Sequence, residues 1–402
     1  MNQLARVSSA ADRAGITVAC LGADDALQRH GAAWRGLAQR LDAMFFKWPA
    51  VYDAWRLTCS EGAEPGVLLA WKQGQLIGVL PVMRARMRRG PGFVPHIDYG
   101  PFDSALVPGG RRLFPVRQIS SVVSWCATWL RPSLLAEPEL RGAVIRALCL
   151  HLANQAQIDQ IVLPVREEEQ AVWLDGLRAA GLAPWVHQLR RKVLTLERLA
   201  PFDAIVAKQN KRYRQNVRRA RAAAAEAGIR FETRVGWQQV APEMDALSQL
   251  AAESWKGQGA ADGRVVIPFD ARQRAFFERA LSAGEPGIEP VLSLGLTRDG
   301  VVSALLSARH GETLTALLTF RNDRYPKASA GLLAIGAGID WGADHGLRRF
   351  DLNSTQDWTR HLSDSSHMLV NVCAFLPTPR GRAYDLIART RRRWEAPGNA
   401  TA

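Results

Sequence analysis

The sequence VLSLGLTRDGVVSALLSAR, at residues 291–309, decides the fold. Two apolar runs flank an Asp-Gly dipeptide, which is typical of tight turns, so this stretch predicts a two-stranded hairpin. Another strand is expected at residues 314–320, followed by a loop, a helix that begins at residues 329–331, and a strand at residues 350–353. This order places the unpaired N–H groups of a helix beside a central strand, where an anionic pyrophosphate could bind.

A second stretch of the chain shows the same pattern. The sequence VLLAWKQGQLIGVLPVMR, at residues 67–84, predicts another hairpin, and a strand at residues 158–165 leads into a helix at residues 167–180. A chain of 402 residues exceeds the usual size of a single core. We therefore expect a duplicated α/β module, with two unrelated α/β domains as the alternative.

These patterns divide the chain into five parts. We expect an N-terminal extension at residues 1–29, a first module at 30–200, a basic connecting helix at 201–228, a second module at 229–379, and a basic C-terminal helix with its tail at 380–402.

Composition indicates an anionic partner. The chain has 52 Lys and Arg against 38 Asp and Glu, a net charge of +14. Coenzyme A, anionic lipid, acyl carrier protein and nucleic acid would all be attracted to such a chain.

No uncharged apolar run is long enough to span a membrane, so we expect a cytoplasmic protein. Such a protein could also bind peripherally at the inner surface of the membrane. The cysteines are scattered without a C-x-x-C pair, which predicts reduced packing residues: Cys20, Cys59, Cys126, Cys149 and Cys373.

The connecting helix is expected to run without a break from residue 202 to residue 227. No acidic residue lies between Asp203 and Glu226, and one half of the helical wheel carries Lys208, Lys211, Arg212, Arg214, Arg218, Arg219 and Arg221. The opposite half is expected to pack against the protein, and it carries Val206, Tyr213, Val217, Ala220 and Ala224. The basic face is either a solvated surface or a platform for phosphates. A second basic cluster at residues 389–393 is either a membrane contact or a solvated tail, and the tail is favoured.

Several common site chemistries are absent from the sequence. It contains no G-x-x-x-x-G-K-S/T loop, no G-x-S-x-G elbow and no H-E-x-x-H zinc helix. His361 and His367 are poorly spaced for a metal pair, so we expect surface or loop histidines and no metal. Gly336, Gly338 and Gly342 are expected to let a helix approach the sheet closely, in preference to binding a dinucleotide.

These elements together resemble a known superfamily. The hairpin, the following strand, the Ser-Ala-Gly-Leu-Leu turn into a helix and the strand at 350–352 are similar to the core of GNAT acyltransferases. Two such modules, with ESWKG at 253–257 and KRYR at 211–214, resemble the CelD-like, BioF-like and FemAB-like double-GNAT proteins. The resemblance implies an α/β protein of the α+β GNAT type. Each of its two tandem modules is expected to be a mixed, mostly antiparallel sheet flanked by helices, with the first module degenerate.

The resemblance also implies where a CoA donor would bind. The usual pyrophosphate loop, R/Q-x-x-G-x-G/A, is incomplete between residues 324 and 333. A degenerate version would consist of Arg324, Lys327, Ser329, Ala330, Gly331 and Leu332. The expected co-substrate is acyl-CoA or acetyl-CoA.

Direct attack on a thioester needs a base, and a proton donor for the thiolate. The candidate bases are Glu253 and Asp351, while Tyr325 is the candidate donor; the alternatives are an exposed helix end, a helix cap and a packing residue, respectively. His310 is a third candidate base, although a surface turn is the favoured interpretation. The expected substrate-binding residues are Trp255, Lys256, Lys211 and Arg214, with a core anchor as the alternative for Trp255.

Three functions remain open from the sequence. The leading hypothesis is an acyltransferase that moves an acyl group from acyl-CoA, or from acyl carrier protein, to an amine or hydroxyl of a small molecule, lipid precursor or saccharide. The second is a FemAB-like transferase that uses aminoacyl-tRNA, the one case in which nucleic acid is an expected partner. The third is a non-catalytic protein that binds anions or an anionic membrane.

Overall fold

The computed structural model describes residues 15–60, 63–89, 111–122, 134–254, 269–354 and 357–395. The strands of the first half are β1 (Ile16–Gly22), β2 (Ala63–Lys72), β3 (Gln75–Arg89), β4 (Arg111–Ser121), β5 (Leu135–Ala136), β6 (Gln160–Arg166) and β7 (Trp185–Leu196). Those of the second half are β8 (Arg230–Val235), β9 (Ile288–Thr297), β10 (Gly300–His310), β11 (Thr313–Arg321), β12 (Arg349–Ser354) and β13 (Ser365–Phe375).

Helices cover both faces of these strands. The first half contains α1 (Ala23–Arg40), α2 (Pro49–Thr58), α3 (Arg141–Ala153) and α4 (Gln170–Ala179). The rest of the chain contains α5 (Phe202–Ala207), α6 (Lys211–Glu226), α7 (Trp237–Val240), α8 (Met244–Glu253), α9 (Ala271–Ser282), α10 (Ala330–Asp344) and α11 (Pro379–Glu395). Short 3-10 turns include η3 (Pro138–Leu140), η6 (Pro326–Ala328) and η7 (Asp357–Leu362).

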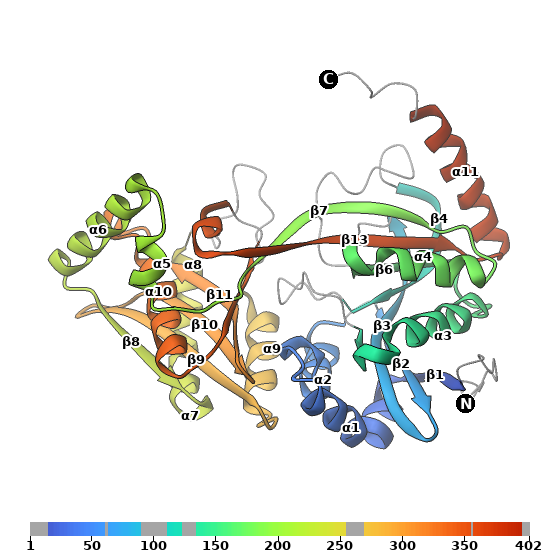
Figure 1. Cartoon of the computed structure of the whole chain (residues 1–402), viewed down its shortest axis with the longest axis horizontal. Helices are drawn as coiled ribbons and strands as arrows, with labels where there is room; N and C mark the ends of the chain where they lie inside the picture. Colours follow the sequence, from blue (N-terminus) through green and yellow to red (C-terminus); the bar gives the residue numbers. More distant parts are fainter. Residues whose placement is uncertain are drawn as a thin grey trace.

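The two halves repeat one strand arrangement within a single continuous sheet (Figure 1). Its order is β1-β2-β3-β4-β6-β13-β7-β12-β11-β10-β9-β8, and β5 pairs with β3. Read inward from either edge, each half has an antiparallel series that ends in one parallel pair, β4 with β6 and β11 with β12. The repeat agrees with the duplication and with both hairpins predicted from the sequence.

The last strand of each half lies between the two halves. β13 pairs with β6 of the first half and with β7, while β7 also pairs with β12 of the second half, all antiparallel. Figure 1 shows β7 and β13 running side by side from one lobe to the other. A second connection is made by Glu285, whose buried carboxylate accepts hydrogen bonds from Arg35 and from the backbone N–H of Ala50 in the first turn of α2. Each half therefore depends on the other for part of its framework.

Strand alternation assigns α8 and α10 to opposite faces of the second half. Leu306 of β10 belongs to the core under α8, whereas its neighbour Leu305 belongs to the core under α10. A Cβ on Gly336 would lie 2.7 Å from Phe202 Cδ1, and one on Gly338 would lie 2.7 Å from Leu305 Cδ2. The close helix packing expected of these glycines is confirmed, and the helix at residues 330–344 rules out a dinucleotide-binding strand there.

The structure corrects the expected continuous basic helix. The chain leaves the helical path between α5 and α6, and the Asn210 side chain caps the new helix by accepting a 2.9 Å hydrogen bond from Tyr213 N. Asparagine favours such a cap because its oxygen satisfies an N–H group that has no partner within the helix. One arginine of the basic face also has an acidic partner, which was not expected. Arg221 forms an ion pair with Asp203, and its guanidinium carbon lies 5.5 Å from the centre of the Phe202 ring.

Other local expectations are also revised. His310 is 2% exposed, and its Nε2 lies 2.9 Å from Thr315 Oγ1, so the surface interpretation is wrong. Cys59 is disulfide-bonded, whereas Cys20, Cys149 and Cys373 are free thiols, so a fully reduced set is wrong. The sheet begins at β1, before residue 30, where the first module was expected to start. None of the helices in the described ranges combines the length and apolar character needed to cross a bilayer.

Candidate active site

The site begins where two parallel strands separate. The pairing of β11 with β12 ends at Thr315 and Asp351, although both strands continue beyond these residues. A register shift in the pairing with β10 leaves Leu317 as an extra residue of β11, which is the pattern of a β-bulge. Ligands in α/β sheets bind at the carboxyl ends of parallel strands, so this opening is a natural binding position.

The first turn of α10 lies beside Arg321, the last residue of β11. Ser329, at φ 44°, turns the chain through the left-handed region, and its carbonyl accepts from Leu332 N at 2.8 Å and Leu333 N at 3.3 Å. Ala330 and Gly331 are buried, and within the described residues their N–H groups have no hydrogen-bond partner. Unpaired N–H groups at a helix start attract an anion, and no acidic residue lies in this first turn.

Basic side chains surround the start of α10. Arg321 lies along Gly331, with its Cδ 3.5 Å from the position of a Gly331 Cβ. Arg324 and Lys327 are exposed, and α6 packs against η6, which places the exposed Lys211 and Arg214 on the same side of the sheet. Arg214 also donates a hydrogen bond to the Gln209 carbonyl. Sequence reasoning missed Arg321, although its place at the end of the strand before the loop was a usable signal.

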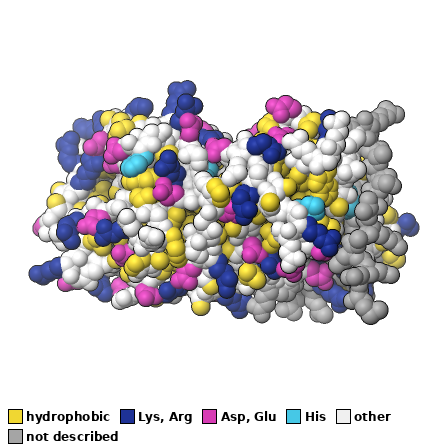
Figure 2. Space-filling model, turned by 90° about the horizontal axis from the view of Figure 1, so that it is seen from below, with side chains coloured by type: hydrophobic (Ala, Val, Ile, Leu, Met, Phe, Trp, Pro, Cys, Tyr) yellow, Lys and Arg dark blue, Asp and Glu magenta, His cyan; other side chains and the backbone are white. Residues whose placement is uncertain are grey.

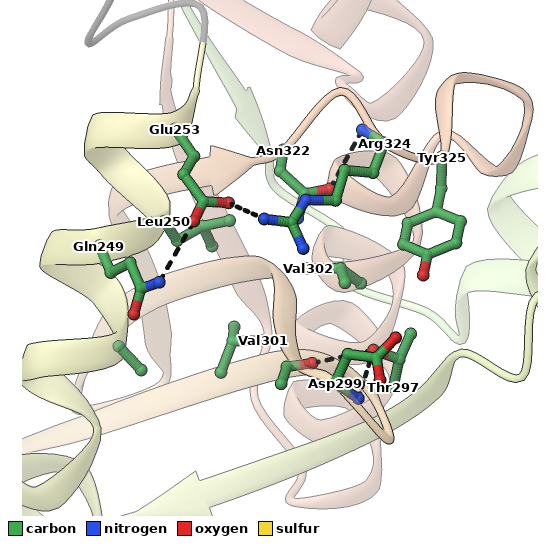
Figure 3. Close-up of a pocket in the computed structure, with 12 residues that line it drawn as sticks. Gln249, Leu250, Glu253, Thr297, Asp299, Val301, Val302, Asn322, Arg324 and Tyr325 are labelled. Atoms are coloured by element: carbon green, nitrogen blue, oxygen red, sulfur yellow. Dashed lines mark hydrogen bonds and ion pairs between the residues drawn. The ribbon is translucent and has the colours of Figure 1, made fainter.

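A pocket of about 190 Å³ joins three of the predicted site residues (Figure 3). Glu253 Oε2 lies 3.2 Å from Arg324 Nη2, and Gln249 donates a 3.2 Å hydrogen bond to the other Glu253 oxygen. Tyr325 lies on the far side of Arg324 from Glu253, above the β9–β10 turn at Asp299. The candidate base, a candidate phosphate ligand and the candidate proton donor therefore share one cavity.

Comparison with known proteins decides the family of the second half. The GNAT acetyltransferase domain family matches residues 211–358. Residues 211–358 are a GNAT acetyltransferase domain. The matched range contains the opening between β11 and β12, the start of α10 and all the pocket residues. The second half therefore contains an acyltransferase domain of the GNAT type.

Solved structures share the fold over nearly the whole chain. A structure of FemX aligns with a TM-score of 0.52 and 13% identity, over 90% of this chain and 98% of that chain. The C-terminal domain of a protein assigned as a lysylphosphatidylglycerol synthetase from Agrobacterium fabrum aligns with a TM-score of 0.50 and 11% identity, over 90% and 96%. The tandem GNAT fold thus spans both halves. No curated protein matches the chain by sequence.

Asp351 occupies a different position in the GNAT domain from Glu253. It is 2% exposed at the end of the β11–β12 pairing, and its Oδ1 accepts from Asn353 N at 2.9 Å. Asn353, at φ 45°, in turn donates from Nδ2 to the Ala316 carbonyl at 3.3 Å. Asp351 therefore holds the turn at the opening, whereas Glu253 lines the pocket.

Tyr213 of α6 and His361 of η7 form a pair that sequence reasoning did not identify. The centroids of their rings lie 4.4 Å apart, and His361 Nδ1 is 3.2 Å from Gln209 Oε1. The Tyr213 hydroxyl is buried without a hydrogen-bond partner, and burial raises the pKa of Tyr213 to about 12. His361 is half-buried, and the short η7 turn that carries it folds back onto α6.

The outward face of α6 is strongly basic. Lys208, Lys211, Arg212, Arg218 and Arg219 are exposed and have no ion-pair partner among the described residues. Val217, Ala220 and Ala224 are buried on the opposite face, as the wheel predicted. Figure 2 shows Lys and Arg side chains gathered at the left edge, the end of the molecule formed by the second half.

The corresponding helix of the first half, α3, has carboxylates next to its start. Glu137 and Glu139 lie at the η3 turn that precedes α3, whereas the first turn of α3, like that of α10, contains no acidic residue. Glu169 also lies next to the start of α3, paired with Arg141 at 2.7 Å. Carboxylates at this end occupy the positive pole of the helix and oppose an incoming phosphate.

Two predicted residues, Trp255 and Lys256, lie outside the described residues. Within the described ranges, no group of at least three His, Cys, Asp or Glu side chains is arranged to hold a metal ion.

Proposed function

We propose that the chain transfers an acyl group from acyl-CoA to an amine or hydroxyl of a small-molecule, lipid-precursor or saccharide acceptor. The donor pyrophosphate binds at the N–H groups of Ala330 and Gly331, with Arg321, Arg324 and Lys327 as the nearest basic residues. The thioester lies in the opening between β11 and β12, and the acceptor occupies the pocket beside Glu253.

One observation carries this proposal. The start of α10 combines buried residues whose N–H groups lack partners, an absence of acidic residues, and Arg321 alongside. Buried backbone N–H groups are rarely left unpaired in folded proteins, so a ligand is the expected partner. The carboxylates of Glu137, Glu139 and Glu169 next to the start of α3 support assigning this role to the second half alone, with the first module as a scaffold.

The pocket supplies the groups for direct attack. The acceptor nitrogen or oxygen forms a bond to the thioester carbon and passes its proton to Glu253. The C–S bond then breaks, and the departing thiolate takes a proton from Tyr325. Proton transfers of this kind contribute about 10²- to 10⁴-fold each to a rate. Arg324 releases Glu253 when it turns to the donor phosphate.

The test is acceptor-dependent release of free thiol. Purified protein is incubated with acetyl-CoA and longer acyl-CoAs in the presence of amine, amino-sugar and hydroxyl acceptors, and CoA thiol is measured over time. We expect release with at least one acceptor, and release about 10²- to 10⁴-fold slower with Glu253→Gln. If no donor and acceptor pair releases thiol, the acyl-CoA proposal is abandoned.

A second candidate is aminoacyl transfer from charged tRNA. It is favoured by the exposed, unpaired basic face of α6 and by the fold shared with FemX and with the lysylphosphatidylglycerol synthetase domain. Binding through many phosphates weakens steeply with salt, whereas binding of one CoA weakens less. If Lys211→Gln with Arg218→Gln abolishes transfer from aminoacyl-tRNA, and acyl-CoA is inert throughout, the second candidate replaces the first.

A further inference from the structure

The C-terminal helix α11 lies at the end of the molecule opposite α6 (Figure 1). Tyr384 and Ala388 on one side of α11 are buried, in a cluster with Val116 of β4, Val162 of β6 and Phe375 of β13. The helix is therefore fixed on the sheet by one face, and its other side is turned to solvent.

That outward side carries exposed apolar residues. Leu386 is 67% exposed and Ile387 is 38% exposed. The other large hydrophobic residue that is exposed in the described part of the chain is Leu57 of α2, at 51%. Leu386 and Ile387 are consecutive and lie about 100° apart around the helix axis, both within its solvent-facing half. Single apolar residues are normal on a surface, so it is their combination with the basic residues beside them that makes this face a candidate contact site.

Arginines flank these apolar residues. At about 100° per residue, Arg382, Leu386 and Arg389 fall within a sector of about 60° on the side opposite Tyr384. Arg380 and Arg382 are exposed, while Arg389 pairs with Asp385. In sequence, the basic residues of the helix are Arg380, Arg382, Arg389, Arg391, Arg392 and Arg393, and its acidic residues are Asp385 and Glu395.

We propose that this outward face of α11 docks the protein on an anionic lipid surface. An interfacial helix inserts apolar side chains at the boundary of the acyl region while its basic residues remain among the headgroups. A nucleic acid would also attract the arginines, but its phosphate backbone offers no apolar region for Leu386 and Ile387. The combination of both residue types on one face therefore favours lipid over the solvated tail expected from the sequence.

The binding strength follows from the two contributions. Each arginine near an anionic membrane contributes about fivefold in affinity, the equivalent of ~1 kcal/mol. Transfer of Leu386 and Ile387 into the interface adds an apolar contribution that does not depend on salt. Loss of either contribution is expected to shift the protein from bound to free.

The experiment is co-sedimentation of the full chain with vesicles. One set contains phosphatidylcholine alone, and the other contains equimolar phosphatidylcholine and phosphatidylglycerol. We expect binding to the second set only. Leu386→Ser with Ile387→Ser should lower the affinity by about tenfold or more, and Arg380→Gln with Arg382→Gln by about 25-fold. All four side chains are exposed, so unchanged thermal unfolding is expected to confirm folding.

Two controls separate α11 from general charge. Leu57→Ser removes an exposed leucine beside Arg56, which pairs with Asp24 and Asp53, and should leave vesicle binding unchanged. Lys211→Gln with Arg218→Gln removes as much charge as the arginine variant, but from the opposite end of the molecule. If that variant loses as much binding as the α11 arginine variant, the docking surface is not α11.

Three results would overturn the proposal. The first is failure of the wild type to bind either vesicle. The second is full binding by the Leu386→Ser, Ile387→Ser variant, which keeps the net charge and would reduce the effect to non-specific attraction. The third is binding of a duplex RNA that equals binding of the anionic vesicles and is insensitive to the same variant, because this would assign the surface to nucleic acid.

Discussion

Arg324 and Glu253 form an ion pair in the wall of the pocket, with 3.2 Å between Nη2 and Oε2. The proposed phosphate ligand and the proposed base thus bind each other in the absence of substrate. The Arg324 side chain is 63% exposed and that of Glu253 is 33% exposed, so the pair contributes at most about 1 kcal/mol to stability. An incoming phosphate can therefore displace the carboxylate at little cost.

Because Glu253 and the donor phosphate compete for Arg324, substitutions at Glu253 and at Arg324 should change the affinity for the donor in opposite directions. Glu253→Gln should bind the acyl-CoA donor up to about fivefold more tightly, because the guanidinium loses its internal partner. The same variant should transfer about 10²- to 10⁴-fold more slowly, because the base is gone. Arg324→Gln should weaken donor binding and reduce turnover far less. Donor affinity is measured by calorimetry and turnover by thiol release. Unchanged turnover in Glu253→Gln would remove Glu253 from the chemistry.

Tyr325→Phe should slow transfer by about 10²-fold or more while leaving donor affinity nearly unchanged, because only the proton for the leaving thiolate is lost. A donor whose thiol is more acidic needs less protonation, so an aryl thioester should recover much of the lost rate. Turnover with acetyl-CoA and with an aryl thioester is compared in both proteins. An equal loss with both donors would indicate that Tyr325 packs and does not donate.

Gly338→Ala should lower the free energy of unfolding by about 1–3 kcal/mol, because the new Cβ meets the buried Leu305. The matched control is Gly331→Ala, whose Cβ would lie at an ordinary 3.5 Å from Arg321 Cδ and should be tolerated. Chemical denaturation gives the free energy of unfolding of each variant for comparison with the wild type. Equal stability of both would refute a packing role for Gly338.

The stability of the first half should depend on pH through Asp159. Burial alone would raise the pKa of Asp159, but hydrogen bonds from Arg117 and from Thr378, at 2.7 Å, lower it overall. A carboxyl with a lowered folded pKa stabilises the protein above its unfolded pKa, near 3.9, and loses that contribution as the pH falls toward the folded pKa.

Arg117→Met should therefore destabilise the protein by about 2–3 kcal/mol at pH 7, since it leaves a buried carboxylate without its main partner. The difference from the wild type should begin to shrink as the pH falls below about 4, where unfolded Asp159 takes up a proton, and should become smallest at the lower pKa of the folded state. Chemical denaturation at several pH values measures the difference in the free energy of unfolding between the variant and the wild type. Arg178→Met, which breaks the exposed pair with Asp175, should change little at any pH. A pH-independent loss in Arg117→Met would contradict this account.

Sequence periodicity was sufficient for the hairpins, the helix start at α10 and the packing glycines, because each depends on local patterns of apolar and turn residues. It also indicated that the buried side of α6 would carry Val217, Ala220 and Ala224. These features need no knowledge of distant contacts.

Long-range contacts were beyond such reasoning. The exchange of β7 and β13 between the halves depends on pairing across the whole chain. His310 lies beside a Gly in a turn pattern, yet the β10–β11 pairing buries it against Thr315. His361 reaches Tyr213 because η7 folds back over more than a hundred residues of separation, and the Asn210 cap prevails over a helix-forming sequence on both sides.

The central claim is tested most directly by calorimetric titration of acetyl-CoA and longer acyl-CoAs into the wild type, Gly331→Glu and Gly331→Gln. Glutamate in a first helical turn is compatible with folding, but it puts a negative charge at the proposed pyrophosphate site. The account predicts binding by the wild type, at least about tenfold weaker binding by Gly331→Glu, the equivalent of 1.4 kcal/mol, and a smaller loss in Gly331→Gln. Absence of heat with every thioester, or equal binding by Gly331→Glu and the wild type, would contradict it.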